Sequence, residues 1–129
     1  MKLQEAVVLF VEDEPLLRES IGTWLSRNVG RVMCAQHGAE ALELLAANKV
    51  DLLLTDLRMP VMDGIALIKK IPKTGLRPRL ILVTGFYDPV LQDVNKLNVD
   101  AVVEKPIDRD ELLRAMRNCL EDADEINNP

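Results

Sequence analysis

The stretch DLLLTDLRMPVMDG, residues 51–64, decides how this chain folds. Its apolar run over residues 52–54 is bounded by turn signals, a pattern typical of a strand that is buried on both faces. The run ends in Thr55 and Asp56, and Pro60 and the Asp63-Gly64 pair then predict a loop and the start of a helix. The stretch therefore predicts a buried strand that brings the Asp56 carboxylate to one edge of a sheet.

The composition is that of an ordinary globular domain. Of the 129 residues, 48% are hydrophobic and 29% are charged, which is enough apolar surface for one core. The net charge of −5 argues against direct nucleic-acid binding, which needs clustered Lys and Arg. No apolar segment is long enough to span a membrane, and acidic residues follow too soon for a signal peptide. We therefore expect a cytoplasmic protein that contacts neither membrane nor nucleic acid.

The cysteines and the single histidine do not indicate a metal site. Cys34 and Cys119 lie far apart and show no paired spacing, which excludes a zinc site visible in the sequence. We expect both cysteines to be small core residues, and His37 to be a loop or cap residue.

Five strand-like runs alternate with five helical patterns. The strands are predicted over residues 6–11, 31–35, 52–54, 80–83 and 101–103. The helices are predicted over residues 16–29, 39–47, 65–71, 89–97 and 108–120. This alternation predicts an α/β fold, a doubly wound parallel sheet with helices on both faces. One domain over residues 1–123 accounts for the pattern, and residues 124–129 form an acidic tail or the start of a linker, with fraying expected from residue 121.

Polar residues stand where four of the predicted strands end, and in such a sheet the ligand site lies beyond these carboxyl ends. Crowded carboxylates repel one another unless a cation intervenes, and two or three carboxyl oxygens with waters suit Mg²⁺. A metal there makes Asp56 a usable nucleophile toward a phosphoryl group, whose oxygens a hydroxyl and an ammonium would hold. The residues in question are Glu12, Asp13, Asp56, Thr84 and Lys105.

The motifs VEDEP, TDLRMPVMDG, LVTG and EKP follow one another over residues 7–120, and the chain resembles the receiver domain of bacterial two-component response regulators. The resemblance implies a flavodoxin-like fold and a role for Asp56 as acceptor of a phosphoryl group from a sensor histidine kinase or a phosphotransfer protein. It also implies an Mg²⁺ cofactor, bound by Asp13, Asp56 and the Arg58 backbone carbonyl.

The same resemblance assigns the remaining site residues and the partners. Glu12 would act through a metal-bound water, Thr84 and Lys105 would contact the phosphoryl group, and the peptide before Pro106 would be cis. The output would be a changed interaction surface, read by an effector domain in a longer chain or by a partner protein. Whether the chain forms a homodimer through the face of its fourth and fifth helices stays open.

Each of these residues also has a simpler interpretation. Glu12 and Asp13 could cap a helix, Asp56 could be a turn residue and Lys105 a surface charge, but four loops would then have to imitate one site. For the other acids we predict purely structural roles, with Asp63 at a turn and helix start and Asp108 as a helix cap; these acids are Glu14, Asp51, Asp63, Glu104, Asp108 and those of the tail.

The sequence departs from the family pattern on the fifth strand. Receivers usually carry Tyr or Phe three residues before the strand-five lysine, and Val102 stands there in this chain. A switch that turns an aromatic ring on this strand is therefore excluded, and we predict that activation remodels residues 85–90, which include Phe86 and Tyr87. Phe86 and Arg58 flank the expected path of attacking water, so we also predict that they slow hydrolysis of the acyl phosphate.

Two other classes of protein fit part of the pattern. A phosphatase of the haloacid-dehalogenase type also uses a strand-end Asp nucleophile with Mg²⁺, but it needs a second Asp two residues later, where this chain has Arg58. A receiver-like module that acts only by binding would not need the full set of site residues. We therefore favour a signalling module that catalyses its own phosphorylation and dephosphorylation.

Overall fold

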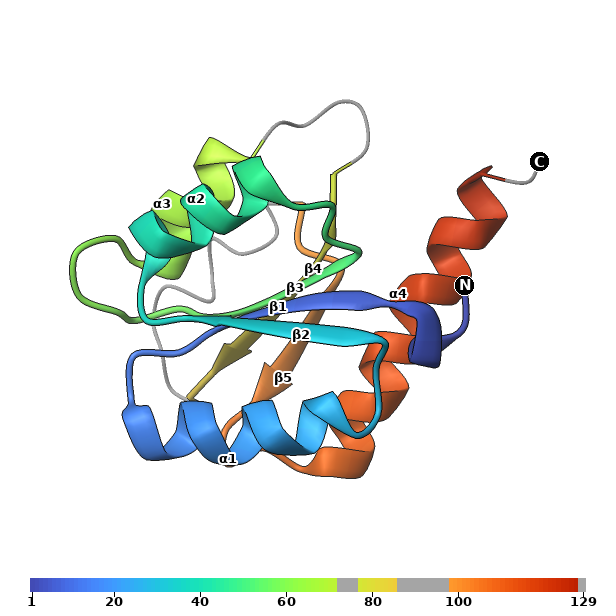
Figure 1. The fold of residues 1–129 in the computed structure, drawn as a ribbon, viewed down its shortest axis with the longest axis horizontal. Coiled ribbons are helices and arrows are strands. Elements are labelled where there is room, and N and C mark those ends of the chain that lie inside the picture. Colours follow the sequence, from blue (N-terminus) through green and yellow to red (C-terminus); the bar gives the residue numbers. More distant parts are fainter. Residues whose placement is uncertain (72–76, 86–97, 128–129) are drawn as a thin grey trace.

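A five-stranded parallel sheet forms the centre of the protein. The computed structural model describes residues 1–71, 77–85 and 98–127. The strands are β1 (Val7–Val11), β2 (Arg31–Ala35), β3 (Leu52–Asp56), β4 (Arg79–Thr84) and β5 (Ala101–Glu104), in the spatial order β2-β1-β3-β4-β5. Figure 1 shows the strands stacked in this order, with β2 in front and β5 behind. The predicted doubly wound, flavodoxin-like sheet is confirmed.

Helices cover both faces of the sheet (Figure 1). α1 (Pro15–Ser26) and α4 (Arg109–Asn127) lie on one face, and α2 (Gly38–Ala47) and α3 (Gly64–Lys70) lie on the other. A short 3₁₀ turn, η1 (Leu3–Glu5), precedes the sheet. None of the helices in the described part of the chain is both long and apolar enough to cross a membrane.

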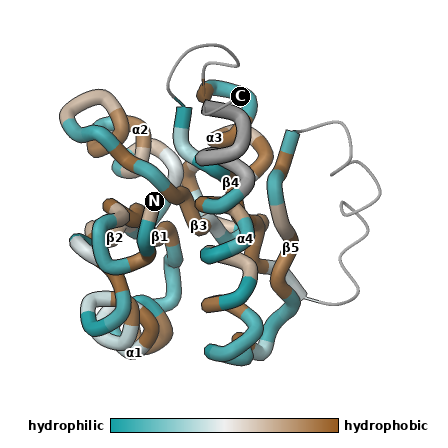
Figure 2. The backbone as a smooth tube through the Cα atoms, turned by 90° about the vertical axis from the view of Figure 1, so that its right-hand side faces the viewer, coloured by the Kyte–Doolittle hydropathy of each residue, from teal (hydrophilic) through white to brown (hydrophobic). Residues whose placement is uncertain are grey.

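The central strands contain consecutive hydrophobic residues because each has a helix layer on both sides. Phe10, Leu54 and Ile81 stand in register on neighbouring strands and belong to the core under α1 and α4. The next row, which includes Leu9 and Leu53, packs under α2 and α3. Figure 2 shows hydrophobic residues (brown) gathered along these strands. The strands that carry the candidate site are therefore packed on both faces.

Several polar residues have the structural roles predicted for them. The side chains of His37, Asp63 and Asp108 accept hydrogen bonds from backbone N–H groups in the first turns of α2, α3 and α4, and so cap these helices. The Asp51 carboxylate accepts from the Val7 N–H at 2.8 Å. Glu14 caps α1, accepting from the N–H groups of residues 16 and 17.

Gly64 sets how closely α3 approaches β3. A Cβ atom at this position would collide with the carbonyl oxygen of Asp56, and the Gly64 N–H donates to the Leu57 carbonyl at 2.9 Å. The loop between β3 and α3 therefore folds back directly onto the strand end that carries Asp56. Within this loop Val61 has a left-handed backbone, with φ of 68°.

Two expectations from the sequence are wrong. Cys34 is exposed, because β2 is an edge strand and its middle is not covered as the central strands are, whereas Cys119 is buried as predicted. The last helix is also longer than predicted, since it was expected to end at residue 120 and α4 continues to Asn127. Residues 121–127 contain neither Gly nor Pro, so no helix-breaking residue stops the helix before Asn127.

The fourth helix predicted from the sequence, over residues 89–97, lies outside the described residues, as do Phe86 and Tyr87. The described part of the chain therefore contains four of the five expected α-helices.

Candidate functional site

The candidate site lies at the carboxyl ends of β1 and β3, where the strand order reverses. From β1 the chain goes to β2 on one side, and it then crosses to β3 on the other side. In doubly wound sheets the crevice at such a reversal is the place where ligands bind. β1 ends immediately before Glu12 and Asp13, and β3 ends with Asp56. The fold thus brings three acidic residues to the point that the topology favours for a ligand.

Lys105 joins two of these carboxylates. Its Nζ donates to Glu12 Oε1 at 2.9 Å and to Asp56 Oδ2 at 2.7 Å. Its backbone N–H donates to the Thr84 carbonyl at 2.7 Å, which ties the end of β5 to the end of β4. The Lys105-Pro106 peptide is cis, as the resemblance implied. A residue from the far side of the sheet is therefore the central cation of the site.

Burial makes this ion-pair network different from a surface salt bridge. The Glu12 side chain is 2% exposed, the Asp56 side chain 12% and the Lys105 side chain 27%. Burial raises the pKa of Glu12 above its usual range, although the hydrogen bonds from Lys105 and the Glu14 N–H act in the opposite direction. Burial also acts to lower the pKa of Lys105, but the hydrogen bonds to Asp56 and Glu12 outweigh it and raise that pKa. Lys105 is therefore held as an ammonium.

The acidic cluster has room and oxygen donors for a divalent cation. Glu12, Asp13 and Asp56 each offer a carboxylate oxygen, and these oxygens lie within 4.8 Å of one another. Asp13 is exposed, while the other two are buried, so the cluster opens to solvent on one side. Lys105 holds only one Asp56 oxygen; the other, Oδ1, accepts a long 3.4 Å hydrogen bond from the Arg58 N–H. The residues fit a hard cation with oxygen ligands, such as Mg²⁺.

The other predicted site residues lie close by in the fold. Thr84 ends β4, is 1% exposed and stands opposite Glu104 in the sheet register. Arg58 is exposed and follows the end of β3 by two residues. Val102, which stands where receivers usually have Tyr or Phe, is 42% exposed on β5 and has no aromatic ring that could turn inward.

Two contacts at the site were not foreseen from the sequence. The Arg18 guanidinium, in the second turn of α1, donates to the carbonyl oxygens of Glu12 and Asp13 at 2.9 and 3.3 Å and fixes the loop that carries both acids. The direct bond between Glu12 and Lys105 was also missed, since Glu12 was expected to act only through a metal-bound water. A basic residue one helical turn after an acidic loop is too common to have pointed to the first contact.

The fold and the acids at the strand ends define a class, the doubly wound α/β proteins with an acidic site at the sheet edge, and comparison with known proteins gives the family. The model of the response regulator receiver domain matches residues 8–117. The chain belongs to this family and is a receiver domain of two-component response regulators. It is 36% identical over 123 residues to the transcriptional regulatory protein GlrR of Escherichia coli K12, covering 94% of this chain and 28% of that protein.

A second relative is the response regulator MprA of Mycobacterium sp. strain KMS, which is 36% identical over 115 residues, 88% of this chain and 50% of that protein. The chain thus spans half or less of the length of these two relatives.

Solved structures agree with this assignment. The response regulator TrrA of Thermotoga maritima, solved in complex with Mg²⁺-BeF, superposes with a TM-score of 0.77 at 28% identity, over 92% of this chain and 99% of that one. The signal receiver domain of an HD domain-containing protein from Pseudomonas fluorescens Pf-5 gives 0.81 at 29% identity, over 91% of this chain and 95% of that one.

Proposed function

We propose that Asp56 is the phosphoacceptor of this receiver and that a sensor histidine kinase or a phosphotransfer protein supplies the phosphoryl group. The observation that carries this proposal is the placement of Asp56. It ends the central strand, lies beside two further carboxylates and is bonded to one ammonium. Glu12 is also buried and bonded to Lys105, but it lies one residue beyond the end of β1, whereas Asp56 is itself the last residue of its strand.

In the transfer, an Asp56 oxygen forms a bond to phosphorus while the bond between phosphorus and the donor imidazole nitrogen breaks. The electron pair of that bond stays on the imidazole, which then takes a proton from solvent. Oδ1 is the better nucleophile of the two oxygens, because Lys105 holds Oδ2. Lys105 and the Thr84 hydroxyl would contact the transferred oxygens, and positioning with charge stabilisation is most of what phosphoryl transfer needs.

Asp13, Asp56 and the Arg58 carbonyl would hold Mg²⁺, with Glu12 acting through a water. When bound, the metal supplies positive charge that reduces repulsion between the Asp56 carboxylate and the anionic donor. The complex of TrrA with Mg²⁺-BeF supports this assignment by analogy.

Loss of the phosphoryl group would occur by attack of water on the acyl phosphate. Arg58 is exposed beside this path, and Phe86, outside the described residues, was predicted to flank it as well. The chain would therefore catalyse its own phosphorylation and dephosphorylation without acting on a separate substrate. Its output would be a changed surface, read by an effector in a longer chain or by a partner protein in the cytoplasm, without direct contact to nucleic acid or membrane. A homodimer through the face of the fourth and fifth predicted helices is one form this output could take.

The test is incubation with acetyl phosphate and Mg²⁺, followed by intact-mass measurement. We expect one added phosphoryl group on the natural chain and none on Asp56→Asn. Asp63→Asn is the matched control, because Asn also caps a helix, and it should be labelled as the natural chain is. Continuous release of phosphate without a labelled chain would instead indicate a phosphatase. No labelling at all would indicate a binding module.

A further inference from the structure

The Arg18 side chain, on α1, holds the backbone that carries two of the predicted site residues. We call residues 12–14, which connect β1 to α1, the acid loop. Arg18 Nη1 donates to the Glu12 carbonyl at 2.9 Å and to the Asp13 carbonyl at 3.3 Å. This nitrogen carries two hydrogens, so one group can serve both oxygens. Arg18 thus fixes the orientation of two successive peptide units in the acid loop.

Other hydrogen bonds hold the two ends of the acid loop. The Glu12 N–H donates to the Ala35 carbonyl on β2 at 3.0 Å. The Glu14 N–H donates to Glu12 Oε2 at 3.1 Å, and the Glu14 carbonyl accepts from the Arg18 N–H at 2.9 Å. The middle residue, Asp13, takes part in none of these three bonds. Its backbone is held by the Arg18 guanidinium.

Asp13 depends on this backbone more than the other two carboxylates of the cluster do. Glu12 and Asp56 are buried, and each accepts a hydrogen bond from Lys105. Asp13 is exposed, so packing does not fix its side chain, and the backbone of the acid loop sets where its carboxylate can lie. Groups that orient a metal ligand matter for binding, since their loss typically weakens metal affinity about 10–100-fold.

We propose that Arg18 is a positioning residue for the cation site: it orients Asp13 through the carbonyls of the acid loop and thereby strengthens Mg²⁺ binding. The inference rests on the proposed function, because that function assigns Asp13 and Asp56 as metal ligands. The guanidinium also carries a positive charge, which by itself would repel Mg²⁺. Positioning and charge therefore predict opposite effects when this side chain is removed.

The experiment is a titration of the intact chain and of Arg18→Met with Mg²⁺, followed by the amide chemical shifts of the acid loop. We expect the dissociation constant for Mg²⁺ to be about tenfold higher in Arg18→Met. Arg18→Lys keeps the charge and a donor on a shorter side chain, so its affinity should lie between those of the natural chain and Arg18→Met. Equal or tighter binding of Mg²⁺ by Arg18→Met would overturn the proposal.

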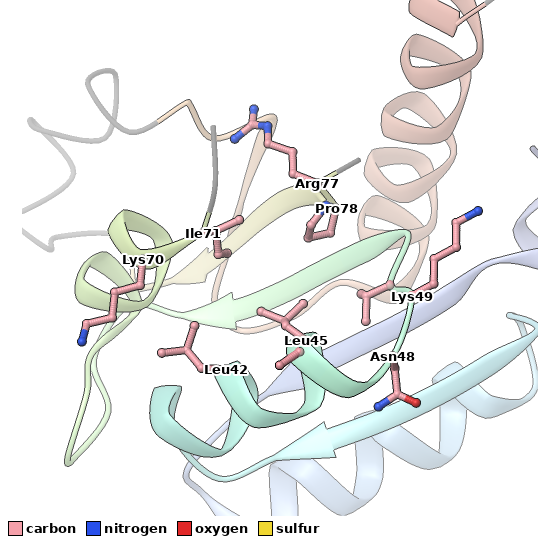
Figure 3. A pocket seen from close by; sticks show the side chains of 10 residues that line it. Leu42, Leu45, Asn48, Lys49, Lys70, Ile71, Arg77 and Pro78 are labelled. Atoms are coloured by element: carbon pink, nitrogen blue, oxygen red, sulfur yellow. The ribbon is translucent and has the colours of Figure 1, made fainter. Parts of the chain in front are cut away.

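Lys49→Met is the matched control, because it removes the same charge at the opposite edge of the sheet. Lys49 is exposed and precedes β3, whereas Asp56 ends that strand. It borders an apolar hollow between α2 and α3, and Figure 3 shows its side chain extending away from that hollow. Solvent and salt screen an exposed charge at this distance, so Mg²⁺ affinity should not change. A loss equal to that of Arg18→Met would overturn the proposal.

A second measurement needs no metal. In the metal-free chain we compare amide hydrogen exchange of the acid loop with that of β3. The N–H groups of Glu12 and Glu14 should exchange roughly fivefold faster in Arg18→Met, because one stabilising contact of the loop is gone, while β3 should be unchanged. Unchanged exchange in the acid loop would contradict the positioning role. Faster exchange in β3 to the same extent would indicate a loss of global stability and would also contradict it.

Labelling by acetyl phosphate separates this inference from the proposed function. At saturating Mg²⁺ Arg18→Met should be labelled within about twofold of the natural rate, because Arg18 does not touch the reacting atoms. Binding of Mg²⁺ and labelling of Asp56 that are both independent of Arg18 would refute this inference alone. A natural chain that binds Mg²⁺ at the acid loop but is not labelled would refute the proposed function alone.

Discussion

Replacing Lys105 by Met removes the ammonium on which the acidic site depends while keeping an unbranched side chain of similar length. In the natural chain this ammonium lies 2.9 Å from a Glu12 oxygen and 2.7 Å from an Asp56 oxygen. Without it, the two carboxylates stay close together and largely buried, and Asp13 adds a third negative charge nearby. We therefore expect Lys105→Met to lower the free energy of unfolding at neutral pH.

The magnitude follows from burial. At an effective dielectric constant of about 20, each of these contacts is worth about 6 kcal/mol before the cost of desolvation is subtracted. Breaking a buried ion pair by removing one partner typically costs about 3–5 kcal/mol. Because the Lys105 side chain is 27% exposed, water replaces part of the lost interaction, and we expect about 2–3 kcal/mol. Added Mg²⁺ should restore much of this loss, since a divalent cation can neutralise the same oxygens once the ammonium is gone.

The assay is urea unfolding, followed by the fluorescence of Trp24, the only tryptophan, and by circular dichroism. If the free energy of unfolding falls by about 2 kcal/mol per M urea, the urea concentration at the unfolding midpoint should be about 1–1.5 M lower in the variant. Mg²⁺ should raise this midpoint more in the variant than in the natural chain. Lys49→Met is the control. Lys49 is exposed and forms no ion pair within the described residues, so its replacement should change the stability by less than about 0.5 kcal/mol.

Equal stability of Lys105→Met and Lys49→Met, or equal stabilisation of both by Mg²⁺, would contradict this role of Lys105. Lys105 would then be a peripheral charge. At acidic pH the difference between the two variants should shrink, because the raised pKa of Glu12 favours its protonated form and the repulsion that the ammonium relieves becomes weaker.

Three further predictions concern the strand ends and the loop after β3. Val61→Asn should stabilise the chain by about 0.5–1 kcal/mol in the same urea assay, because Asn tolerates the left-handed backbone at this position. Val61 is 80% exposed, so the replacement loses no packing. Val61→Thr is the control and should show no gain, because Thr is still β-branched. Gly64→Ala should lower the free energy of unfolding by about 2 kcal/mol or more, because the added Cβ would collide with the Asp56 carbonyl. Gly85→Ala is the control: its added Cβ would meet no atom within 4 Å, so its thermal unfolding should be nearly unchanged. The folded-state pKa of Glu12 is raised, so the natural chain binds a proton there more readily when folded and loses stability as pH rises above the usual Glu value. Relative to the natural chain, Glu12→Gln should therefore gain stability as the pH rises above the usual Glu value, and a difference independent of pH would contradict this assignment.

Local patterns in the sequence predicted most of the fold. The apolar runs and their turn signals placed all five strands to within a few residues, because a strand buried on both faces needs consecutive apolar side chains. The same patterns did not predict the exposure of Cys34, since its run resembles the other strands and only the strand order makes β2 an edge.

The sequence by itself determined that acidic residues follow β1 and end β3, and that a lysine follows β5, since these are properties of short stretches. Only the tertiary structure decided which of these residues meet. Lys105 bonds to Glu12 across 93 positions and to Asp56 across 49, and the order β2-β1-β3-β4-β5, with the cross-over connections between its strands, makes both contacts possible. Periodicity reports the environment of single elements, whereas a contact between distant residues depends on how all the elements pack.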